Sequence, residues 1–215
     1  MSVTAEEPRN KRDGLTEAVR IAAEAFTAQS WRDINMTEIA RAAKCSLSTI
    51  YNAFGGKEQF LLYVVSHAVN VKMPDIGASD HDSLRPEVLI WLNLHAHARF
   101  LAADQTRQAF ANLASLPVEV VEPRRPYFER ISRLCDHIGQ LTAQAQEAGS
   151  MRPGDSRAAG VNMLALSGWR IGLWPLVLGD LAGQPDLEQL TDDAIAPYLT
   201  EAGAAHMAQW RSSRP

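Results

Sequence analysis

Apolar residues recur at helical spacing along almost the whole sequence. In one early segment, Leu15, Val19, Ala22 and Phe26 follow one another at steps of four, three and four, so they form a single stripe on a helix. Alternating runs of Val, Ile and Thr bounded by Asn-Gly or Asp-Gly turns, which are typical of strands and hairpins, are missing. The sequence therefore predicts an all-α protein.

The apolar stripes and the breaks between them set the expected helix bounds. We expect helices over residues 15–29, 35–43, 47–53, 57–71, 87–103, 105–115, 127–148, 156–173 and 187–209. The stretch 74–86 is polar and contains Pro and Gly, so it is the clearest candidate for a loop between two units.

Composition excludes several classes of protein. The two cysteines, Cys45 and Cys135, lie far apart without CxxC spacing, so neither a disulfide framework nor a zinc knuckle is expected. Residues 1–14 hold no apolar run that resembles a secretory signal, so we expect a cytoplasmic protein. The most apolar stretch, 161–179, contains Arg170, and a buried helix is expected there, with no membrane association. A net charge of −4 argues against wholesale wrapping of nucleic acid but leaves room for a local basic site.

Residues 35–54 carry the most specific pattern. Asn35 and Ser46 are each placed to cap a short helix, and the turn between the two helices has about three residues, which is helix-turn-helix spacing. The stretch from Arg41 to Lys57 contains no acidic residue and, counting its two ends, three basic residues. The expected outward residues at the start of the second helix are Leu47, Ser48, Thr49, Tyr51 and Asn52. From the residues alone, a structural helical hairpin remains an alternative.

The segment 15–61 resembles the DNA-binding domain of the tetracycline-repressor (TetR) family. The resemblance rests on TEIARAA at 37–43, STIY at 48–51, Phe54 and KEQFL at 57–61. It implies an N-terminal three-helix helix-turn-helix domain over residues 1–57, with a flexible arm at 1–13. It also implies a larger helical ligand-binding and dimerisation domain over 58–215, and the remaining sequence matches in helical content and length.

The resemblance also assigns DNA contacts. It places Thr37 and Lys57 near backbone phosphates, and it puts the start of the recognition helix at Ser46. Lys44 stands where the family usually has Gly, and left-handed geometry costs a non-Gly residue about 1 to 2 kcal/mol, so we expect either a distorted turn or a further phosphate contact there. Leu47 stands where the family usually has a basic residue, and its side chain would pack on a thymine methyl. The full expected set is Thr37, Lys44, Ser46, Leu47, Ser48, Thr49, Tyr51, Asn52 and Lys57.

A candidate effector site lies in the larger domain. The helix at 88–101 is apolar on nearly every side, so other helices are expected to surround it. The candidate lining residues for an apolar or aromatic ligand are Trp91, His95, Arg99, Phe110, Met163, Trp169 and Trp174. Ordinary core packing is the alternative for each of them. His95 and His97 are two residues apart and cannot easily chelate one metal, so we expect neither a metal nor a cofactor.

The last two expected helices suggest a homodimer. Small residues at Gly160, Ser167, Gly168 and Gly172 permit close approach, and the final helix carries a stripe of Leu187, Leu190, Ala194, Tyr198, Ala202 and Ala205. Two recognition helices related by a two-fold axis would read a palindromic operator on double-stranded DNA. We therefore expect a ligand-responsive transcriptional regulator, a repressor, and not an enzyme, since no catalytic motif is found. The alternative is a helical small-molecule carrier or enzyme with a degenerate helix-turn-helix.

Overall fold

The computed structural model describes residues 7–72, 84–115, 125–172 and 185–214. Within these ranges the regular structure is helical, and the β-pairing is limited to an isolated bridge between Met151 and Leu199. The predicted all-α class is confirmed. Contacts divide the chain into two compact units, called here unit 1 (Met1–Lys72 and Asp104–Tyr127) and unit 2 (Met73–Ala103 and Phe128–Pro215).

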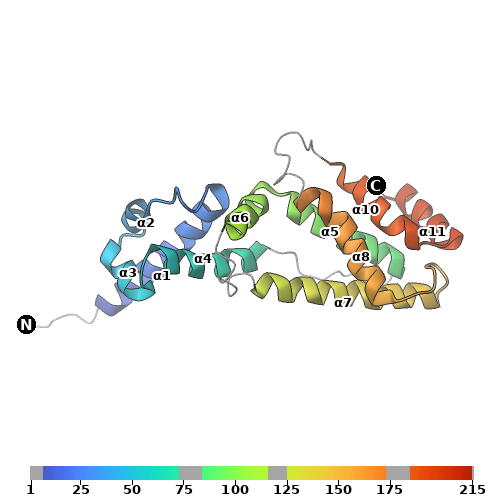
Figure 1. Ribbon diagram of the computed structural model, residues 1–215, viewed down its shortest axis with the longest axis horizontal. Coiled ribbons are helices and arrows are strands. Elements are labelled where there is room, and N and C mark those ends of the chain that lie inside the picture. The colour runs from blue at the N-terminus through green and yellow to red at the C-terminus, as the bar shows by residue number, and fades with distance from the viewer. Residues whose placement is uncertain (1–6, 73–83, 116–124, 173–184, 215) are drawn as a thin grey trace, which may run out of the picture. The chain divides into compact units, whose positions relative to one another are not determined.

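Unit 1 contains five helices within the described residues, and Figure 1 shows α2 and α3 beside the longer α1 and α4. They are α1 (Glu7–Ala28), α2 (Met36–Ala42), α3 (Leu47–Phe54), α4 (Lys57–Lys72) and α6 (Asp104–Ala114). Phe26, Ile50 and Phe60 are completely buried at the centre of one hydrophobic cluster, to which α6 adds Ala109 and Leu113. The small domain therefore completes its core with a helix from much later in the sequence.

A buried amide joins α6 to the end of α1. Asn112 Nδ2 donates to the carbonyl oxygens of Phe26 at 2.7 Å and Gln29 at 3.0 Å, and its Oδ1 accepts from the backbone N–H of Trp31 at 3.1 Å. The indole Nε1 of Trp31 donates to Ser115 Oγ at 2.8 Å. These bonds satisfy carbonyls that the end of a helix leaves without partners, so they hold α1 and α6 together.

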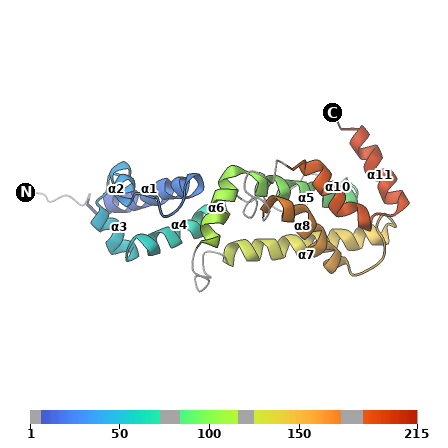
Figure 2. The same cartoon turned by 45° about the horizontal axis from the view of Figure 1, so that its top comes forward.

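Unit 2 contains α5 (Pro86–Ala102), α7 (Arg125–Glu147, of which unit 2 includes the part from Phe128), α8 (Ser156–Gly172), α10 (Leu187–Ile195) and α11 (Glu201–Ser212). α5 packs against α8, α10 and α11, as the turned view in Figure 2 shows. Its core centres on Ile90, Leu94, Ile138 and Met163, all fully buried. The encirclement of α5 explains why its sequence is apolar on nearly every side.

The expected continuous helix at 187–209 is wrong. The structure has α10, then a short 3₁₀ turn η3 (Ala196–Tyr198), then α11. Pro197 has no N–H for a helix interior, and the backbone is extended at Leu199. Thr200 then starts α11, because its hydroxyl accepts the N–H of Gly203 at 3.1 Å.

The turn into α11 requires a glycine. A Cβ on Gly203 would lie 2.0 Å from the carbonyl oxygen of Ser150, and that same carbonyl accepts the N–H of Thr200 at 3.0 Å. Only a residue without a side chain permits this approach. The chain reversal before α11 is thereby fixed against the turn that precedes α8.

Other boundaries also differ from the sequence-based expectation. α1 begins at Glu7, so residues 7–13 of the expected arm are helical. α4 and α6 belong to unit 1, whereas the expected division fell after residue 57, and this functional division stays a prediction. The loop expected at 74–86 falls mostly outside the described residues. Among the described helices, none is long and apolar enough to cross a membrane.

Candidate DNA-binding helix pair

Two side-chain caps define the helix pair α2–α3, as the sequence predicts. Asn35 Oδ1 accepts the backbone N–H of Thr37 at 3.0 Å and of Glu38 at 3.4 Å. Ser46 Oγ accepts the N–H of Thr49 at 3.0 Å. At the other end, α3 stops at Gly55, whose φ of 88° is readily adopted only by glycine. Both helices are therefore fixed locally, by neighbouring residues in the chain.

The turn between the helices is left-handed at one residue. Lys44 has a φ of 53°, and among the described residues it is the one non-glycine residue with a positive φ. Its N–H donates to Arg41 O at 3.2 Å, and the N–H of Cys45 donates to Ala40 O at 3.0 Å. These bonds help to offset the cost of left-handed geometry at a residue with a Cβ, about 1 kcal/mol. Lys44 thus adopts the left-handed geometry of the usual glycine despite its cost.

Small residues allow α2 and α3 to cross closely. Ala40 and Ala43 are buried, and Ile50 of α3 is fully buried beside them. A Cβ on Gly14 of α1 would lie 3.0 Å from Cys45 Cβ, so α1 also approaches the turn closely. Burial raises the pKa of the Cys45 thiol, which is therefore a packing group in its neutral form. Tight packing of this kind holds the outer face of the pair in one orientation.

That outer face is polar but less exposed than expected. Thr37, Ser48 and Asn52 are exposed. Leu47 and Tyr51 are half-buried and pack against the cluster of unit 1, which corrects the expectation that both point fully outward. Since only part of each side chain is covered, the remainder stays on the surface of α3.

Three hydroxyls are preorganised at the start of α3. Ser46 Oγ lies 2.8 Å from Ser48 Oγ and 2.7 Å from Thr49 Oγ1. Hydroxyls can both donate and accept, so this group suits phosphate oxygens and base edges alike. The structure brings these three expected residues together.

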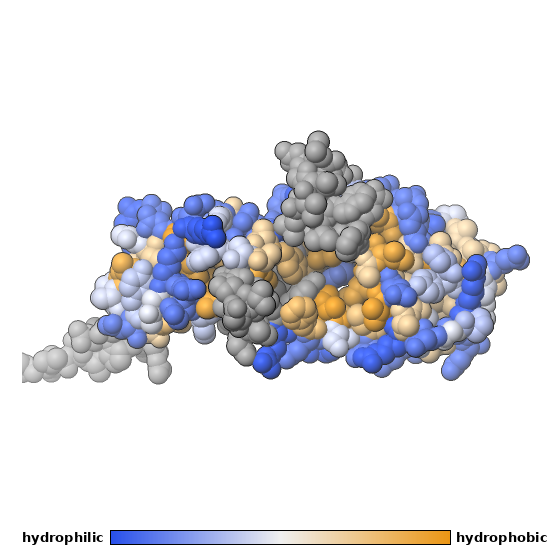
Figure 3. All heavy atoms as spheres, viewed as in Figure 1, coloured by the Kyte–Doolittle hydropathy of each residue, from blue (hydrophilic) through white to orange (hydrophobic). Residues whose placement is uncertain are grey.

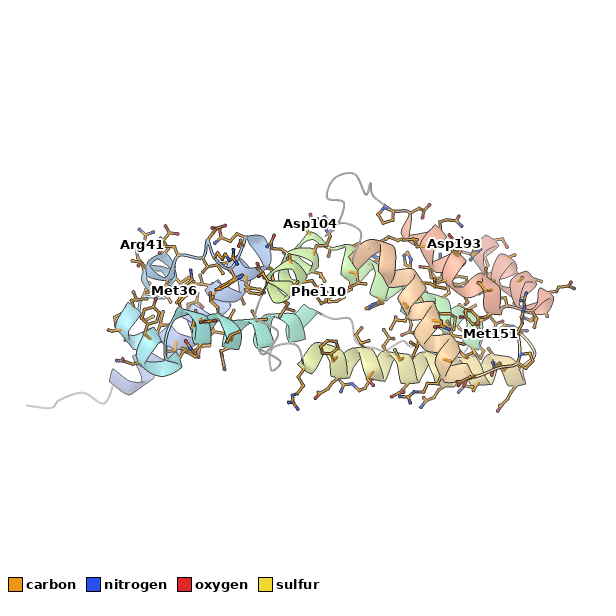
Figure 4. All side chains as sticks on the ribbon, in the orientation of Figure 1. Met36, Arg41, Asp104, Phe110, Met151 and Asp193 are labelled. Carbon is orange, nitrogen blue, oxygen red and sulfur yellow. The ribbon has the colours of Figure 1, made fainter. Side chains whose placement is uncertain are left out.

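Several cations lie on and beside the helix pair. Arg41 and Lys44 are exposed, and Arg41 points outward from α2 in Figure 4. Lys57 Nζ donates to the carbonyl oxygen of Arg32 at 3.1 Å, which leaves two of its three protons for another acceptor. Arg41 was missing from the expected contacts, although the acid-free stretch that begins with it was the available signal.

The helix pair lies in a segment that matches a known protein family. Residues 19–64, which contain the helix pair, match the family model described as bacterial regulatory proteins, tetR family. The resemblance to the TetR family is thereby confirmed for this N-terminal segment. The N-terminal helices thus form the DNA-binding part of a transcriptional regulator, and the matched family is one of regulators, not of enzymes. None of the curated proteins compared with the sequence is a significant match.

Solved structures of transcriptional regulators share the fold over nearly the whole chain. A TetR-family transcriptional regulator of Mesorhizobium loti is 18% identical, with 92% of this chain and 100% of that chain covered and a TM-score of 0.67. A transcriptional regulator of Saccharomonospora viridis in complex with choline is 17% identical (91% and 100% covered, TM-score 0.65). SmeT, the repressor of the Stenotrophomonas maltophilia multidrug efflux pump SmeDEF, is 16% identical (90% and 94% covered, TM-score 0.59).

The candidate effector residues that the structure describes fall in both units, and their role as a ligand site stays a prediction. Trp91 and Met163 are buried in the core of unit 2, whereas Phe110, labelled in Figure 4, belongs to α6 and packs in unit 1. Arg99 is exposed and His95 is half-buried, with its Nδ1 buried and unpaired. Trp174 and the side chain of Trp169 lie outside the described residues. Among the described residues no three His, Cys, Asp or Glu side chains form a metal site.

Trp91 has specific partners that the sequence did not reveal. Its indole Nε1 donates to Asp192 Oδ1 at 2.6 Å, and its ring stacks on His95 with centroids 4.7 Å apart. Trp210 of α11 contacts it edge-on at 5.3 Å. Burial lowers the pKa of His95, so this ring is neutral at pH 7. Trp91, Asp192 and Trp210 are far apart in the sequence, so no local pattern could predict that they meet.

The expected dimer surface also changes in detail. Leu190 and Ala194 of α10 are buried within their own subunit, so they do not form an outward stripe. A Cβ on Gly160 would lie 3.0 Å from the backbone of Gly139 in α7, which shows that this small residue serves packing within the chain. On α8, Val161 and Leu166 are instead the large exposed apolar residues, and Figure 3 shows hydrophobic surface over this helix.

Proposed function

We propose that this protein is a ligand-responsive repressor whose α3 helix reads a palindromic operator. The observation that carries the proposal is the capped helix pair, whose second helix α3 and the turn before it contain no acid. At the start of α3, three hydroxyls are linked by hydrogen bonds, those of Ser46, Ser48 and Thr49. The exposed cations Arg41 and Lys44 belong to α2 and the turn that precede them. Hydroxyls and cations are the groups that position a protein on phosphates and read groove edges.

The proposed contacts divide into two kinds. Lys44, Lys57 and Thr37 would hold the DNA backbone, and the exposed Asn52 would reach a base edge or phosphate together with Tyr51. Leu47 offers a partly exposed apolar group to a thymine methyl. Backbone contacts predict an affinity that falls steeply with salt, whereas contacts to base edges predict discrimination among duplexes.

We also propose that the protein acts as a dimer through α8. Val161 is 45% exposed and Leu166 is 52% exposed, and both would be covered by the same helix of a second subunit. Two α3 helices in such a dimer would read operator half-sites about one DNA turn apart, roughly 34 Å. One short helix contacts few base pairs, so a dimer is needed to recognise a longer operator.

The proposed effector binds unit 2 and acts on unit 1 through two helices. α6 follows α5 after Ala103 alone, and Asn112 of α6 holds the end of α1. A ligand that prefers one arrangement of α5 would shift α6 and α4, and its effect equals its differential affinity for the two arrangements. The regulator from S. viridis holds choline and SmeT represses a drug-efflux pump, so neighbours of this fold supply precedents for small-molecule binding and for repression.

The experiment measures binding to duplexes from the regions that flank the protein's own coding sequence. Fluorescence anisotropy with labelled fragments compares the natural chain with Asn52→Ala and Tyr51→Phe, each at low and moderate salt. Gln29→Ala, an exposed amide at the end of α1, is the matched control.

We expect Asn52→Ala and Tyr51→Phe to weaken binding at least about fivefold, or about 1 kcal/mol, because each removes one polar contact. Gln29→Ala should bind as the natural chain does. Binding that never distinguishes any fragment from an unrelated duplex would contradict the proposal and favour the small-molecule carrier.

A further inference from the structure

Two indole rings of unit 2 form a corner that already holds a cation. Trp91 of α5 and Trp210 of α11 meet with centroids 5.3 Å apart and planes at 65°. The guanidinium carbon of Arg214 lies 4.4 Å from the Trp91 centroid and 4.0 Å from the Trp210 centroid. Both distances fall within the range over which an aromatic face attracts a cation. The corner therefore supplies two walls suited to a flat, delocalised positive charge.

Carboxylates complete the surroundings of this corner. Asp192 Oδ1 accepts the indole N–H of Trp91 at 2.6 Å and also pairs with Arg211. Glu188 Oε1 lies 3.7 Å from Arg214 Nη1. Glu188 and Asp192 are four residues apart, on one side of α10. His95, stacked on Trp91, adds no positive charge at pH 7, because burial lowers its pKa. The groups that face the corner thus favour a cation.

The present occupant is held weakly. Arg214 follows the end of α11, which is Ser212, and its N–H makes a single backbone bond to Arg211 O at 3.2 Å. Glu188, its partner in an ion pair at 3.7 Å, is 66% exposed, and a pair with such an exposed member contributes little. One third of the Arg214 side chain is exposed, so the corner opens to the surface. An occupant that lies beyond the end of α11 can leave while Trp91, Trp210 and Asp192 keep their mutual contacts.

We propose that this corner, called here the Trp91–Trp210 site, binds a small molecule with a guanidinium group, and that Arg214 is the internal group that this ligand replaces. The guanidinium is planar, weakly hydrated and always charged, and it both stacks on aromatic faces and pairs with carboxylates. A ligand of this class reproduces each contact that Arg214 makes. It differs from the apolar effector expected from the sequence, and it makes Arg214 a competitor that sets the affinity.

The inference shares Trp91 with the proposed effector region and rests on unit 2 as the ligand-binding part. Its test reads occupancy and not DNA binding, so the two proposals can fail separately. The probe is methylguanidinium, with neutral methylurea as its control of similar shape, at constant ionic strength. Occupancy is followed by NMR of the indole N–H groups in the full chain, with each resonance assigned by a Trp→Phe variant.

Arg214→Ala is the informative variant, and Arg157→Ala, an exposed arginine on α8, is its matched control. We expect the indole resonances of Trp91 and Trp210 to move saturably with methylguanidinium in Arg214→Ala. The apparent affinity should be at least tenfold higher than in the natural chain or in Arg157→Ala. The Trp31 resonance, from an indole bonded to Ser115 in unit 1, should stay in place.

A second variant separates the site from general effects on folding. Glu188→Gln in the Arg214→Ala background changes an exposed side chain and should lower methylguanidinium affinity several-fold, because it removes the nearest carboxylate charge. Three results would each overturn the proposal. They are no saturable shift in Arg214→Ala, equal affinity in Arg214→Ala and the natural chain, and equal shifts with methylurea.

Discussion

The buried imidazole of His97 shows how a single residue makes stability depend on pH. It lies on α5, and a Cβ on Gly168 of α8 would be 3.9 Å from its Nε2. Burial lowers its pKa from 6.5 to about 4. Below pH 6.5 the unfolded chain therefore binds a proton that the folded chain does not, and the free energy of unfolding falls as the pH drops towards 4.

We expect His97→Leu to remove part of this acid sensitivity. From pH 7 to pH 5 the natural chain should lose about 2 kcal/mol through His97, a figure that follows from 1.36 kcal/mol per pKa unit over about 1.5 units. The variant should lose that much less. Urea unfolding of both proteins at the two pH values, at one protein concentration, measures the difference, and equal losses would show that His97 does not titrate on unfolding.

At this scale the sequence predicts residues whose role is set by their near neighbours. The caps at Asn35 and Ser46 and the left-handed Lys44 follow from residues within a few positions. Trp91 is different, because its partners Asp192 and Trp210 lie about a hundred residues later. Which indole meets which carboxylate is fixed only by the packing of α5, α10 and α11, so no local spacing predicts it.

At the scale of elements, start and stop signals give most helices to within a few residues, and the failure has a clear cause. Residues 187–209 have a helical stripe, but Pro197 and the capping residue Thr200 divide them. The prediction of one helix followed the apolar stripe and gave too little importance to Pro197 and Thr200. The start of α1 was placed too late for a related reason, since its first turns are polar and show no apolar period.

The N-terminus of α3 allows stability to be separated from DNA binding. Ser46→Asp keeps an oxygen that can accept the N–H of Thr49, so the free energy of unfolding should change by less than about 0.5 kcal/mol. The new charge would face DNA phosphates, and we expect operator affinity to fall at least about tenfold, or 1.4 kcal/mol.

Ser46→Asn is the neutral control for this substitution. It supplies a cap without a charge and should retain more affinity than Ser46→Asp. Thermal unfolding and anisotropy measured on the same samples give both quantities. If Ser46→Asp binds the operator as well as Ser46→Asn does, the start of α3 does not lie near the DNA backbone.

For the whole molecule, the proposed dimer depends on the exposed side of α8. Leu166→Glu places a charge in the surface that a second subunit would cover, and burial of an unpaired charge is costly. We expect a monomer in sedimentation velocity and a loss of operator affinity, because one α3 then reads one half-site. The fold of each subunit should persist, since Leu166 is 52% exposed.

Phe128→Glu provides the control for that experiment. Phe128 is 60% exposed and lies on α7, so the change is similar in size and charge but falls outside the proposed interface. It should leave the dimer intact. A Leu166→Glu protein that still sediments as a dimer would assign association to another surface.

Because α6 completes the core of unit 1, the order of synthesis bears on when this domain can finish folding. Asn112, Ala109 and Leu113 emerge from the ribosome only after α5 has been made. A nascent chain that stops at Lys72 lacks the amide that holds the end of α1 and leaves apolar surface uncovered. Unit 1, which holds the candidate DNA-binding helix pair, therefore matures only once α5 of unit 2 has been made.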